Sequence, residues 1–292
     1  MRHKDQGGSH MCTSITFKNG DFYFGRNMDL EYSFGECVTV TPRRFPFRFR
    51  YEGALASHYA MIGMAAGEAS FPLYAEAVNE KGLCMAGLNF PGNASYGKAA
   101  EGKANAAVYE LIPWLLGTCA SVGEAEEKLG TLNLTDDAFS ETMPPAPLHW
   151  MLADRERCLV IESVREGINI YEDPVGVLTN NPPFEYHRTN LNNYLNVTAQ
   201  YPRAQFFRPG ETGGAAAGED GPDLKPCSQG MGGIGLPGDF SAASRFVKAA
   251  FLKWNSVCGK SEEENVSQVF HILDGVAMPR GAVITQDGNY DF

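Results

Sequence analysis

The chain has 292 residues, of which 43% are hydrophobic and 20% are charged, as is ordinary for a globular protein with a sizeable core. Its formal net charge of −11 argues against non-specific nucleic-acid binding, because that binding needs a basic surface. The sequence contains no apolar run long enough to cross a bilayer and no recognisable signal peptide. We therefore expect neither a nucleic-acid partner nor a membrane partner.

The seven cysteines are widely spaced, and no two of them form a CxxC pair. Their odd number and their spacing are typical neither of a disulfide framework nor of a zinc site. Such cysteine usage fits a reducing compartment, so we expect a cytoplasmic protein. Residues 1–10 end in Gly-Ser-His and resemble the remnant of a cloning tag, and we expect residues 11–292 to form a single domain.

The first expected element is a tight hairpin around the pair Asn19-Gly20. Two short β-prone runs flank this pair, and Asn-Gly tolerates positive φ at both central positions of a two-residue turn. Cys12 opens the first strand, and Arg26 and Asp29 close the second. The hairpin therefore brings a thiol, a cation and a carboxylate together. The alternative is that Cys12 is a small apolar packing residue, as a lone cysteine at a strand start usually is.

The rest of the chain predicts strands, helices, strands and helices in that order. Capping boxes begin at Ser121 and Ser261, and each precedes a helix. Strands are expected over residues 37–42, 61–65, 76–90, 148–153, 158–164, 168–171 and 176–179, with the start of another at 283–292; the run 76–90 is a strand, a turn at 79–82 and a second strand. Helices are expected over residues 105–118, with a kink at Pro113, and over 122–129, 187–200, 240–257 and after Ser261. This order indicates an α+β protein in which helices cover both outer faces of two packed antiparallel sheets.

Residues 208–233 are rich in glycine, alanine and proline, and we expect them to form a long loop. Residues 230–235 match the pattern G-x-G-x-x-G literally. A dinucleotide fingerprint needs a strand before this pattern and a helix after it, whereas no apolar strand precedes it here and Leu-Pro-Gly follows. We interpret the segment as a flexible, close-packed loop that leads into the next helix.

Three polar residues stand in apolar surroundings: Asn89, Asn180 and Arg245. An asparagine at a strand end can offer its side-chain N–H to an oxyanion. The alternative is that each asparagine caps a turn or a strand end, and that Arg245 is a cation on a helix surface. The histidines do not cluster with carboxylates at the spacing of a metal site, and we expect His149 to be a core histidine.

A nucleophilic Cys12 would need a base, and no histidine with a supporting signature accompanies it. Its own α-amine can serve, because α-amines titrate near about 7.7–8.0 and thiols near about 8.5, so the two groups are matched for proton exchange at neutral pH. This arrangement works only if Cys12 is the first residue of the mature chain.

Eight motifs occur together along the sequence: MCT (residues 11–13), GRNMD (25–29), NEKGL (79–83), GLNFPG (87–92), PLHW (147–150), PVGVLTNNP (174–182), GMGGIGLPGD (230–239) and SRF (244–246). Each alone is weak, but their joint occurrence in this order is very specific. Through them the sequence closely resembles the choloylglycine hydrolases, meaning bile salt hydrolases and penicillin V acylases, of the N-terminal nucleophile superfamily.

The resemblance implies a four-layer αββα sandwich and hydrolysis of an amide bond without a metal or other cofactor. It implies that Cys12 is the nucleophile and that its α-amine is the base. The remaining roles that it implies are as follows: Asp29 holds the amine, Arg26 lies against the thiolate, Asn89 and Asn180 stabilise the oxyanion, and Arg245 supports the nucleophile.

The resemblance also implies a substrate class, a bile acid joined to glycine or taurine. The motif around Asn89 favours bile salts, because penicillin acylases tend to carry tyrosine at that position. The alternatives are an acylase for penicillin V or acyl-homoserine lactones, and a homologue that binds bile acids without hydrolysing them if Cys12 is not N-terminal.

The resemblance further implies a homotetramer, which the family builds partly through a loop that would fall in residues 186–233. The family also continues with further strands beyond residue 292. We therefore expect an exposed sheet edge here.

Overall fold

The computed structural model describes residues 11–66, 70–202, 226–285 and 288–289. The chain begins with the predicted hairpin of β1 (Met11–Asn19) and β2 (Asp21–Asp29), joined at Gly20, whose φ is 71°. The short strand β14 (Val177–Leu178) pairs with the other side of β1. These three strands form a small antiparallel sheet in which β2 is an edge strand.

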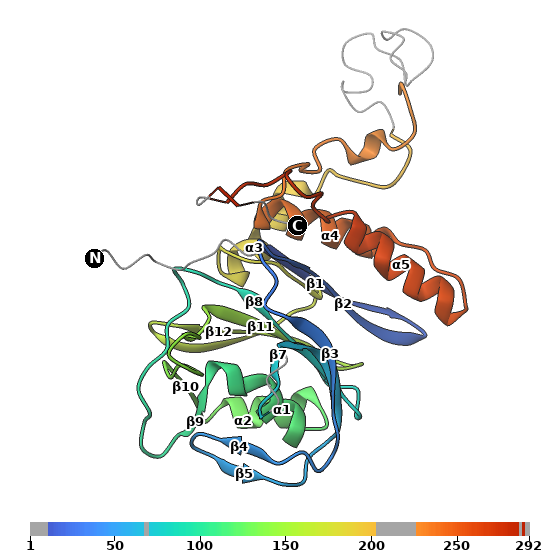
Figure 1. Cartoon of the computed structure of the whole chain (residues 1–292). Helices are drawn as coiled ribbons and strands as arrows, with labels where there is room; N and C mark the ends of the chain where they lie inside the picture. Colours follow the sequence, from blue (N-terminus) through green and yellow to red (C-terminus); the bar gives the residue numbers. More distant parts are fainter. Residues whose placement is uncertain (1–10, 67–69, 203–225, 286–287, 290–292) are drawn as a thin grey trace, which may run out of the picture.

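A larger antiparallel sheet lies beneath the small one (Figure 1). It contains seven strands, and the pair β11–β12 has the bounds that the sequence predicted. In sheet order the strands are β13 (Gly167–Glu172), β12 (Cys158–Val164), β11 (Leu148–Ala153), β8 (Cys84–Asn89), β7 (Leu73–Asn79), β6 (Met61–Ala66) and β3 (Glu36–Thr41).

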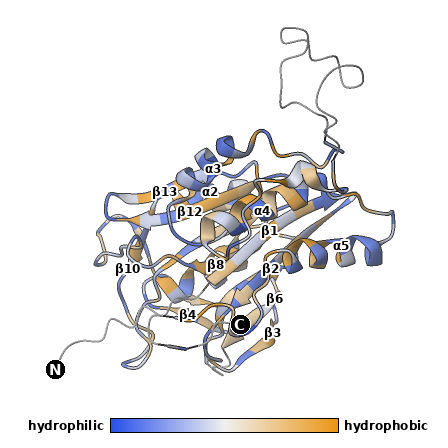
Figure 2. Ribbon diagram, turned by 90° about the horizontal axis from the view of Figure 1, so that it is seen from above, coloured by the Kyte–Doolittle hydropathy of each residue, from blue (hydrophilic) through white to orange (hydrophobic). Residues whose placement is uncertain are grey.

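Helices cover the outer faces of both sheets, as predicted (Figure 1). The helices α1 (Leu111–Thr118) and α2 (Val122–Leu129) lie on the large sheet, and α4 (Ala242–Asn255) and α5 (Glu262–Asp274) lie on the small one. Seen from above in Figure 2, α4 lies over β1 and α5 lies beside β2. The fold is therefore the expected α+β sandwich with four αββα layers. Within the described part of the chain, no helix is long and apolar enough to cross a membrane.

The central strands of the large sheet are buried on both faces. Successive side chains of a strand point to opposite faces, so one strand serves two apolar cores. Met85, Trp150 and Leu152 belong to the core shared with α1 and α2. Ala86 and Met151, their neighbours along β8 and β11, belong to the core shared with the small sheet, α4 and α5. The two cores hold the layers in register, and the site described below lies between the sheets.

The helix predicted over residues 105–118 is wrong in its first part. The strand β9 (Ala104–Ala107) pairs in parallel with β10 (Leu132–Thr135), and α1 begins only at Leu111. Pro113 is the third residue of α1, where the backbone N–H has no partner within the helix, so proline breaks no helical hydrogen bond there. The proline that suggested a kink therefore lies in the first turn. A further small hairpin pairs β4 (Phe47–Phe49) with β5 (Gly53–Leu55).

The polar helix predicted over residues 187–200 is shorter than expected. The structure has α3 (Phe184–Asn190) and a 3₁₀ turn (Leu191–Tyr194), and Asn192 Nδ2 donates to Thr189 O at 2.9 Å. Asparagine side chains compete in this way with helical hydrogen bonds.

Most of the predicted loop over residues 208–233 and the suspected tag over residues 1–10 lie outside the described residues. The G-x-G-x-x-G segment contains a 3₁₀ turn (Met231–Gly233), and no strand lies in residues 226–230. A Cβ on Gly232 would lie 2.4 Å from Thr198 O, so the backbone is close-packed at Gly232, whereas a Cβ on Gly230 would have open space around it. The strand expected to start within residues 283–292 is not present in residues 283–285 or 288–289. The other residues of this segment lie outside the described residues.

The N-terminus of α4 is held by a small polar cluster. The Ser241 hydroxyl caps the helix by accepting from Ser244 N at 3.3 Å. Asp239 Oδ1 accepts from Ser241 N at 2.9 Å, and Oδ2 accepts from the Ser244 hydroxyl at 2.6 Å. Hydrogen bonds from Ser241 and Ser244 lower the pKa of Asp239 to about 2. Arg245 follows Ser244 directly in α4, so the cluster also fixes the position of a residue of the candidate site.

We predict that Asp239→Asn lowers the free energy of unfolding by about 0.5 kcal/mol at pH 7. This is less than the usual effect of losing a helix N-cap, because Asp239 is exposed and supports the cap residue Ser241 from outside the helix. The native pKa of about 2 is below the unfolded value of about 3.9, so this stabilisation is complete above about pH 4 and disappears as the pH falls through 2. Urea unfolding at several pH values measures the difference. The exposed Asp21→Asn serves as the control. If the free energies of unfolding of the wild type and the variant differ by the same amount from pH 5 to pH 2, the carboxylate of Asp239 is not the stabilising group.

Candidate active site

The thiol of Cys12 lies against a guanidinium group. Cys12 is 3% exposed, and Arg26 Nη2 donates to its Sγ at 2.8 Å. The hairpin register explains this contact. Ser14 is opposite Arg26, and Cys12 is two residues before Ser14, so its side chain points to the same face of the sheet. The predicted meeting of these two residues is therefore a product of local geometry, and the cation can stabilise negative charge on the sulfur.

Arg26 is itself held by the large sheet. Its side chain is 6% exposed, and its Nη1 donates to Glu76 Oε2 at 3.0 Å and to Gly87 O at 3.0 Å. Burial opposes the charge of Arg26, but attraction to Cys12 and Glu76 outweighs it and raises the pKa of the guanidinium above its ordinary value. Sequence reasoning missed Glu76. Its signal was a single carboxylate inside the apolar strand β7.

The backbone nitrogen of Cys12 is bound as well as its sulfur. It donates to Asn180 Oδ1 at 2.9 Å. Asn180 Nδ2 in turn donates to Asn89 O at 2.8 Å. Only the oxygen of an amide side chain can accept and only its nitrogen can donate, so these contacts fix the orientation of the Asn180 amide. Asn89 lies at the end of β8, and the Asn180 amide joins its carbonyl to the nitrogen of Cys12.

Arg245 reaches this cluster from the first turn of α4. It is 1% exposed, so the alternative of a cation on a helix surface is wrong. Its Nη2 donates to Asn180 Oδ1 at 2.7 Å, and its Nη1 donates to Thr13 Oγ1 at 2.7 Å and to Cys12 O. Its Nε donates to Phe240 O at 2.9 Å. Arg245 thus connects the start of β1 with Asn180.

Asp29 is buried at the end of β2 and lies opposite Met11 in the hairpin register. This places it one position from Cys12, next to the peptide bond that precedes the cysteine. The six residues predicted for the site therefore converge from β1, β2, the end of β8, the segment after β14, and α4.

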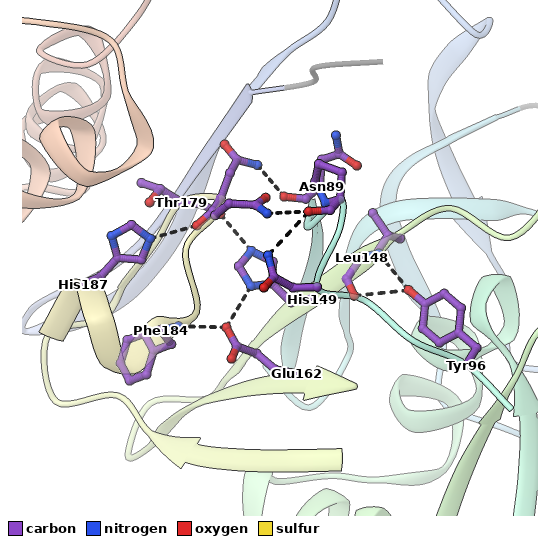
Figure 3. A network of polar contacts seen from close by, with 12 residues as sticks. Asn89, Tyr96, Leu148, His149, Glu162, Thr179, Phe184 and His187 are labelled. Carbon is purple, nitrogen blue, oxygen red and sulfur yellow. Dashed lines mark hydrogen bonds and ion pairs between the residues drawn. The ribbon is translucent and has the colours of Figure 1, made fainter. Parts of the chain in front are cut away.

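A second group of polar residues contacts the backbone of Thr179 and Asn180, and Figure 3 shows His149, Glu162 and His187 of this group. His149 is a buried core histidine, as predicted, and its Nδ1 lies 3.2 Å from Glu162 Oε1. Its Nε2 lies 2.9 Å from Thr179 O, and His187 Nε2 lies 2.8 Å from Asn180 O. Sequence reasoning missed Glu162 and His187. Glu162 could have been noticed as the one charge in the apolar strand β12, whereas nothing in the sequence marked His187.

In the described residues, no group of three or more His, Cys, Asp or Glu side chains is placed to hold a metal ion. A cavity of about 590 Å³ lies between β2, β6, β7 and α5. Its lining includes Arg26 and Glu76, together with apolar side chains such as Phe24, Val269 and Phe270. Cys12 is not part of this lining, but its partner Arg26 is, so the cavity lies next to the residue that contacts the sulfur.

We predict that Arg26→Gln slows alkylation of Cys12 by iodoacetamide at pH 7 by about tenfold, because the variant loses the cation that stabilises the thiolate. Peptide mapping by mass spectrometry separates Cys12 from the other cysteines. The control is Arg43→Gln, which removes an exposed cation paired with Glu80. Equal alkylation rates in the two variants would show that Arg26 does not activate the thiol.

Comparisons with known proteins agree with the resemblance. A family model described as linear amide C–N hydrolases, choloylglycine hydrolase family, matches residues 12–292. The chain is 49% identical to the bile salt hydrolase/transferase of Lactiplantibacillus plantarum, over 97% of this chain and 83% of that protein. It is 38% identical to the bile salt hydrolase/transferase of Clostridium perfringens, over 96% of this chain and 83% of that protein.

Solved structures agree as well. The crystal structure of a mutant conjugated bile acid hydrolase from Clostridium perfringens matches with a TM-score of 0.84 and 37% identity, over 96% of this chain and 83% of that one. The structure of penicillin V acylase from Agrobacterium tumefaciens matches with a TM-score of 0.70 over 95% of this chain and 75% of that one, but at 19% identity it indicates the fold alone. The chain belongs to the choloylglycine hydrolase family of linear amide C–N hydrolases.

Proposed function

We propose that this protein hydrolyses the amide bond of bile acids conjugated to glycine or taurine, with Cys12 as the nucleophile. The substrate class is supported by the names of its relatives, which include bile salt and conjugated bile acid hydrolases. The observation that carries the proposal is the double anchoring of Cys12. Its sulfur lies 2.8 Å from Arg26 Nη2, and its nitrogen lies 2.9 Å from Asn180 Oδ1.

The first step is attack of the Cys12 sulfur on the substrate carbonyl. In a chain that begins at Cys12, the neutral α-amine has two hydrogens and a lone pair. It can keep donating to Asn180 and still accept the thiol proton. Asp29 would orient the amine from the neighbouring position. Arg26 would stabilise the charge on the sulfur before it attacks.

The attack places negative charge on the former carbonyl oxygen. Asn89 and Asn180 are the proposed donors to this oxyanion. Nδ2 of Asn180 carries two hydrogens, and the bond to Asn89 O uses one of them, so the second can be donated. Arg245 holds the Asn180 amide in place, which pre-organises that donor.

Collapse of the tetrahedral intermediate breaks the carbon–nitrogen bond. The protonated α-amine of Cys12 gives its proton to the departing nitrogen, which leaves as glycine or taurine. The bile acid remains on sulfur as a thioester. Water, deprotonated by the same amine, then hydrolyses the thioester and regenerates the thiol.

The quaternary structure and location expected from the sequence remain proposals: a homotetramer in the cytoplasm, with residues 11–292 as one domain. Size-exclusion chromatography with light scattering tests the tetramer directly. A monomer at micromolar concentration would contradict it. Fractionation of the native host tests the location.

We predict that Cys12→Ala reduces hydrolysis of glycine- and taurine-conjugated bile acids to background while leaving bile-acid binding intact, because only the nucleophile is removed. Release of free glycine or taurine measures hydrolysis, and calorimetry measures binding. The control is Cys37→Ala, which removes an exposed thiol on β3 and should keep full activity. Turnover retained by Cys12→Ala would overturn the assignment of the nucleophile.

The same assays distinguish the other members of this reaction class. Penicillin V and acyl-homoserine lactones are tested beside the bile salts at equal concentration. A higher kcat/KM for either of them would overturn the proposed substrate class while leaving the proposed chemistry in place. If bile acids bind but are not hydrolysed by a chain shown to begin at Cys12, the protein is a binding homologue.

A further inference from the structure

We propose that His149 and His187 are positioning residues for the hydrolytic reaction, because their imidazoles hold the two peptide groups that flank Asn180. The proposal rests on the function proposed above, in which Asn180 helps to stabilise the oxyanion. Neither histidine contacts the reacting atoms, and each acts through the backbone of Asn180.

Asn180 needs such support because the sheet ends just before it. The strand β14 contains only Val177 and Leu178, and its ladder with β1 ends at the pair Ser14 and Leu178. The next two residues, Thr179 and Asn180, are buried, and buried carbonyl groups need hydrogen-bond donors. Two histidine side chains supply these donors in place of a neighbouring strand (Figure 3).

His149 holds the peptide before the Cα of Asn180. Its Nε2 lies 2.9 Å from Thr179 O. A carbonyl oxygen only accepts, so Nε2 carries the hydrogen. The ring is fixed by stacking on Phe90, with 4.3 Å between ring centroids and 5° between planes. Its Nδ1 lies 3.2 Å from Glu162 Oε1. That oxygen accepts from Phe184 N at 2.9 Å, which connects the ring to the start of α3.

His187 holds the peptide after the Cα of Asn180. Its Nε2 lies 2.8 Å from Asn180 O, so Nε2 again carries the hydrogen. The ring stacks on Phe246 of α4, with 5.0 Å between centroids and 17° between planes. Burial lowers the pKa of His187, which is consistent with a neutral ring that donates from Nε2 alone.

The neighbouring side chains act in the same direction. The Thr179 hydroxyl donates to Ala242 O at 3.0 Å, at the start of α4, and Arg245 binds the Asn180 side chain. The backbone of Asn180 is therefore fixed on both sides, and its amide is fixed at both ends. An oxyanion donor acts only when it is aimed within a few tenths of an ångström of where the charge develops, so loss of either imidazole should act on the transition state.

The test compares glutamine and asparagine at each histidine. The amide nitrogen of glutamine can reach the position of histidine Nε2, whereas that of asparagine reaches only the position of Nδ1. We expect His149→Asn and His187→Asn to lower kcat by about 10- to 100-fold with KM changed less than about twofold. We expect His149→Gln and His187→Gln to stay within about fivefold of the wild-type kcat.

Two further readouts separate positioning from general damage to the fold. Alkylation of Cys12 should be unchanged in all four variants, because Arg26 and not Asn180 contacts the sulfur. Each asparagine variant should melt somewhat below its glutamine partner, since both lose the stacked ring but only asparagine leaves a buried carbonyl without a donor. The values of kcat are therefore compared well below both melting temperatures. Equal losses of kcat in the glutamine and asparagine variants would overturn the proposal. So would a loss of kcat that is accompanied by an equal fall in the rate of Cys12 alkylation.

A measurement on the wild-type protein does not depend on activity. Long-range proton–nitrogen NMR spectra of ¹⁵N-histidine-labelled protein report which ring nitrogen is protonated, and the two glutamine variants assign the signals. We expect protonated Nε2 in both histidines, and a ring protonated only at Nδ1 in either of them would overturn the proposal. If the tautomers are as expected but bile salts are not hydrolysed, the proposed function fails and the holding of Asn180 stands.

Discussion

The buried guanidinium of Arg26 is the interaction on which the arrangement of the site depends. It belongs to β2 of the small sheet, yet its partners include Glu76 and Gly87 of the large sheet as well as the sulfur of Cys12. A buried cation is tolerated only when it is paired and hydrogen-bonded, so the two sheets must pack at this distance and in this register. The requirement that holds the sheets together also places a positive charge beside the thiol.

The second constraint is long-range and centres on Asn180. Cys12 and Arg245 are separated by 233 residues, yet both bind the Asn180 side chain. The helix α4 brings Arg245, the hairpin brings Cys12, and the segment after β14 brings the asparagine between them. Each of these elements is anchored elsewhere, α4 by its N-terminal cap and β14 by pairing with β1. The polar cluster therefore forms only when the hairpin, the segment after β14 and α4 have come together.

Local rules were enough to predict the elements that depend on neighbouring residues. The Asn19-Gly20 turn predicted a hairpin and the proximity of Cys12 and Arg26, and the caps at Ser121 and Ser261 marked two helix starts. The pattern around Pro113 predicted a wrong helix start, because an apolar pattern does not show which segments pair as strands. Residues 104–107 form a strand because they pair with β10.

The sequence could not show contacts that cross the sandwich. Glu76 and Glu162 were visible only as single charges in apolar strands, and their partners come from other elements. His187 carried no local signal, because its role depends on where β14 ends. Asn89, Asn180 and Arg245 stood out as polar residues in apolar surroundings, and the motif resemblance implied their roles. The structure adds that the Asn180 side chain binds Cys12 N, Arg245 and the carbonyl of Asn89.

The most direct test of the account is to trap the acylated enzyme. The protein is mixed with a conjugated bile acid and quenched in acid within the first turnovers, and the acylated peptide is sequenced by mass spectrometry. The account predicts a bile-acid thioester on the sulfur of Cys12 in a peptide whose first residue is Cys12. An acyl group on any other residue would contradict the nucleophile, and a thioester on Cys12 in a chain that still carries Met11 would contradict the α-amine as the base.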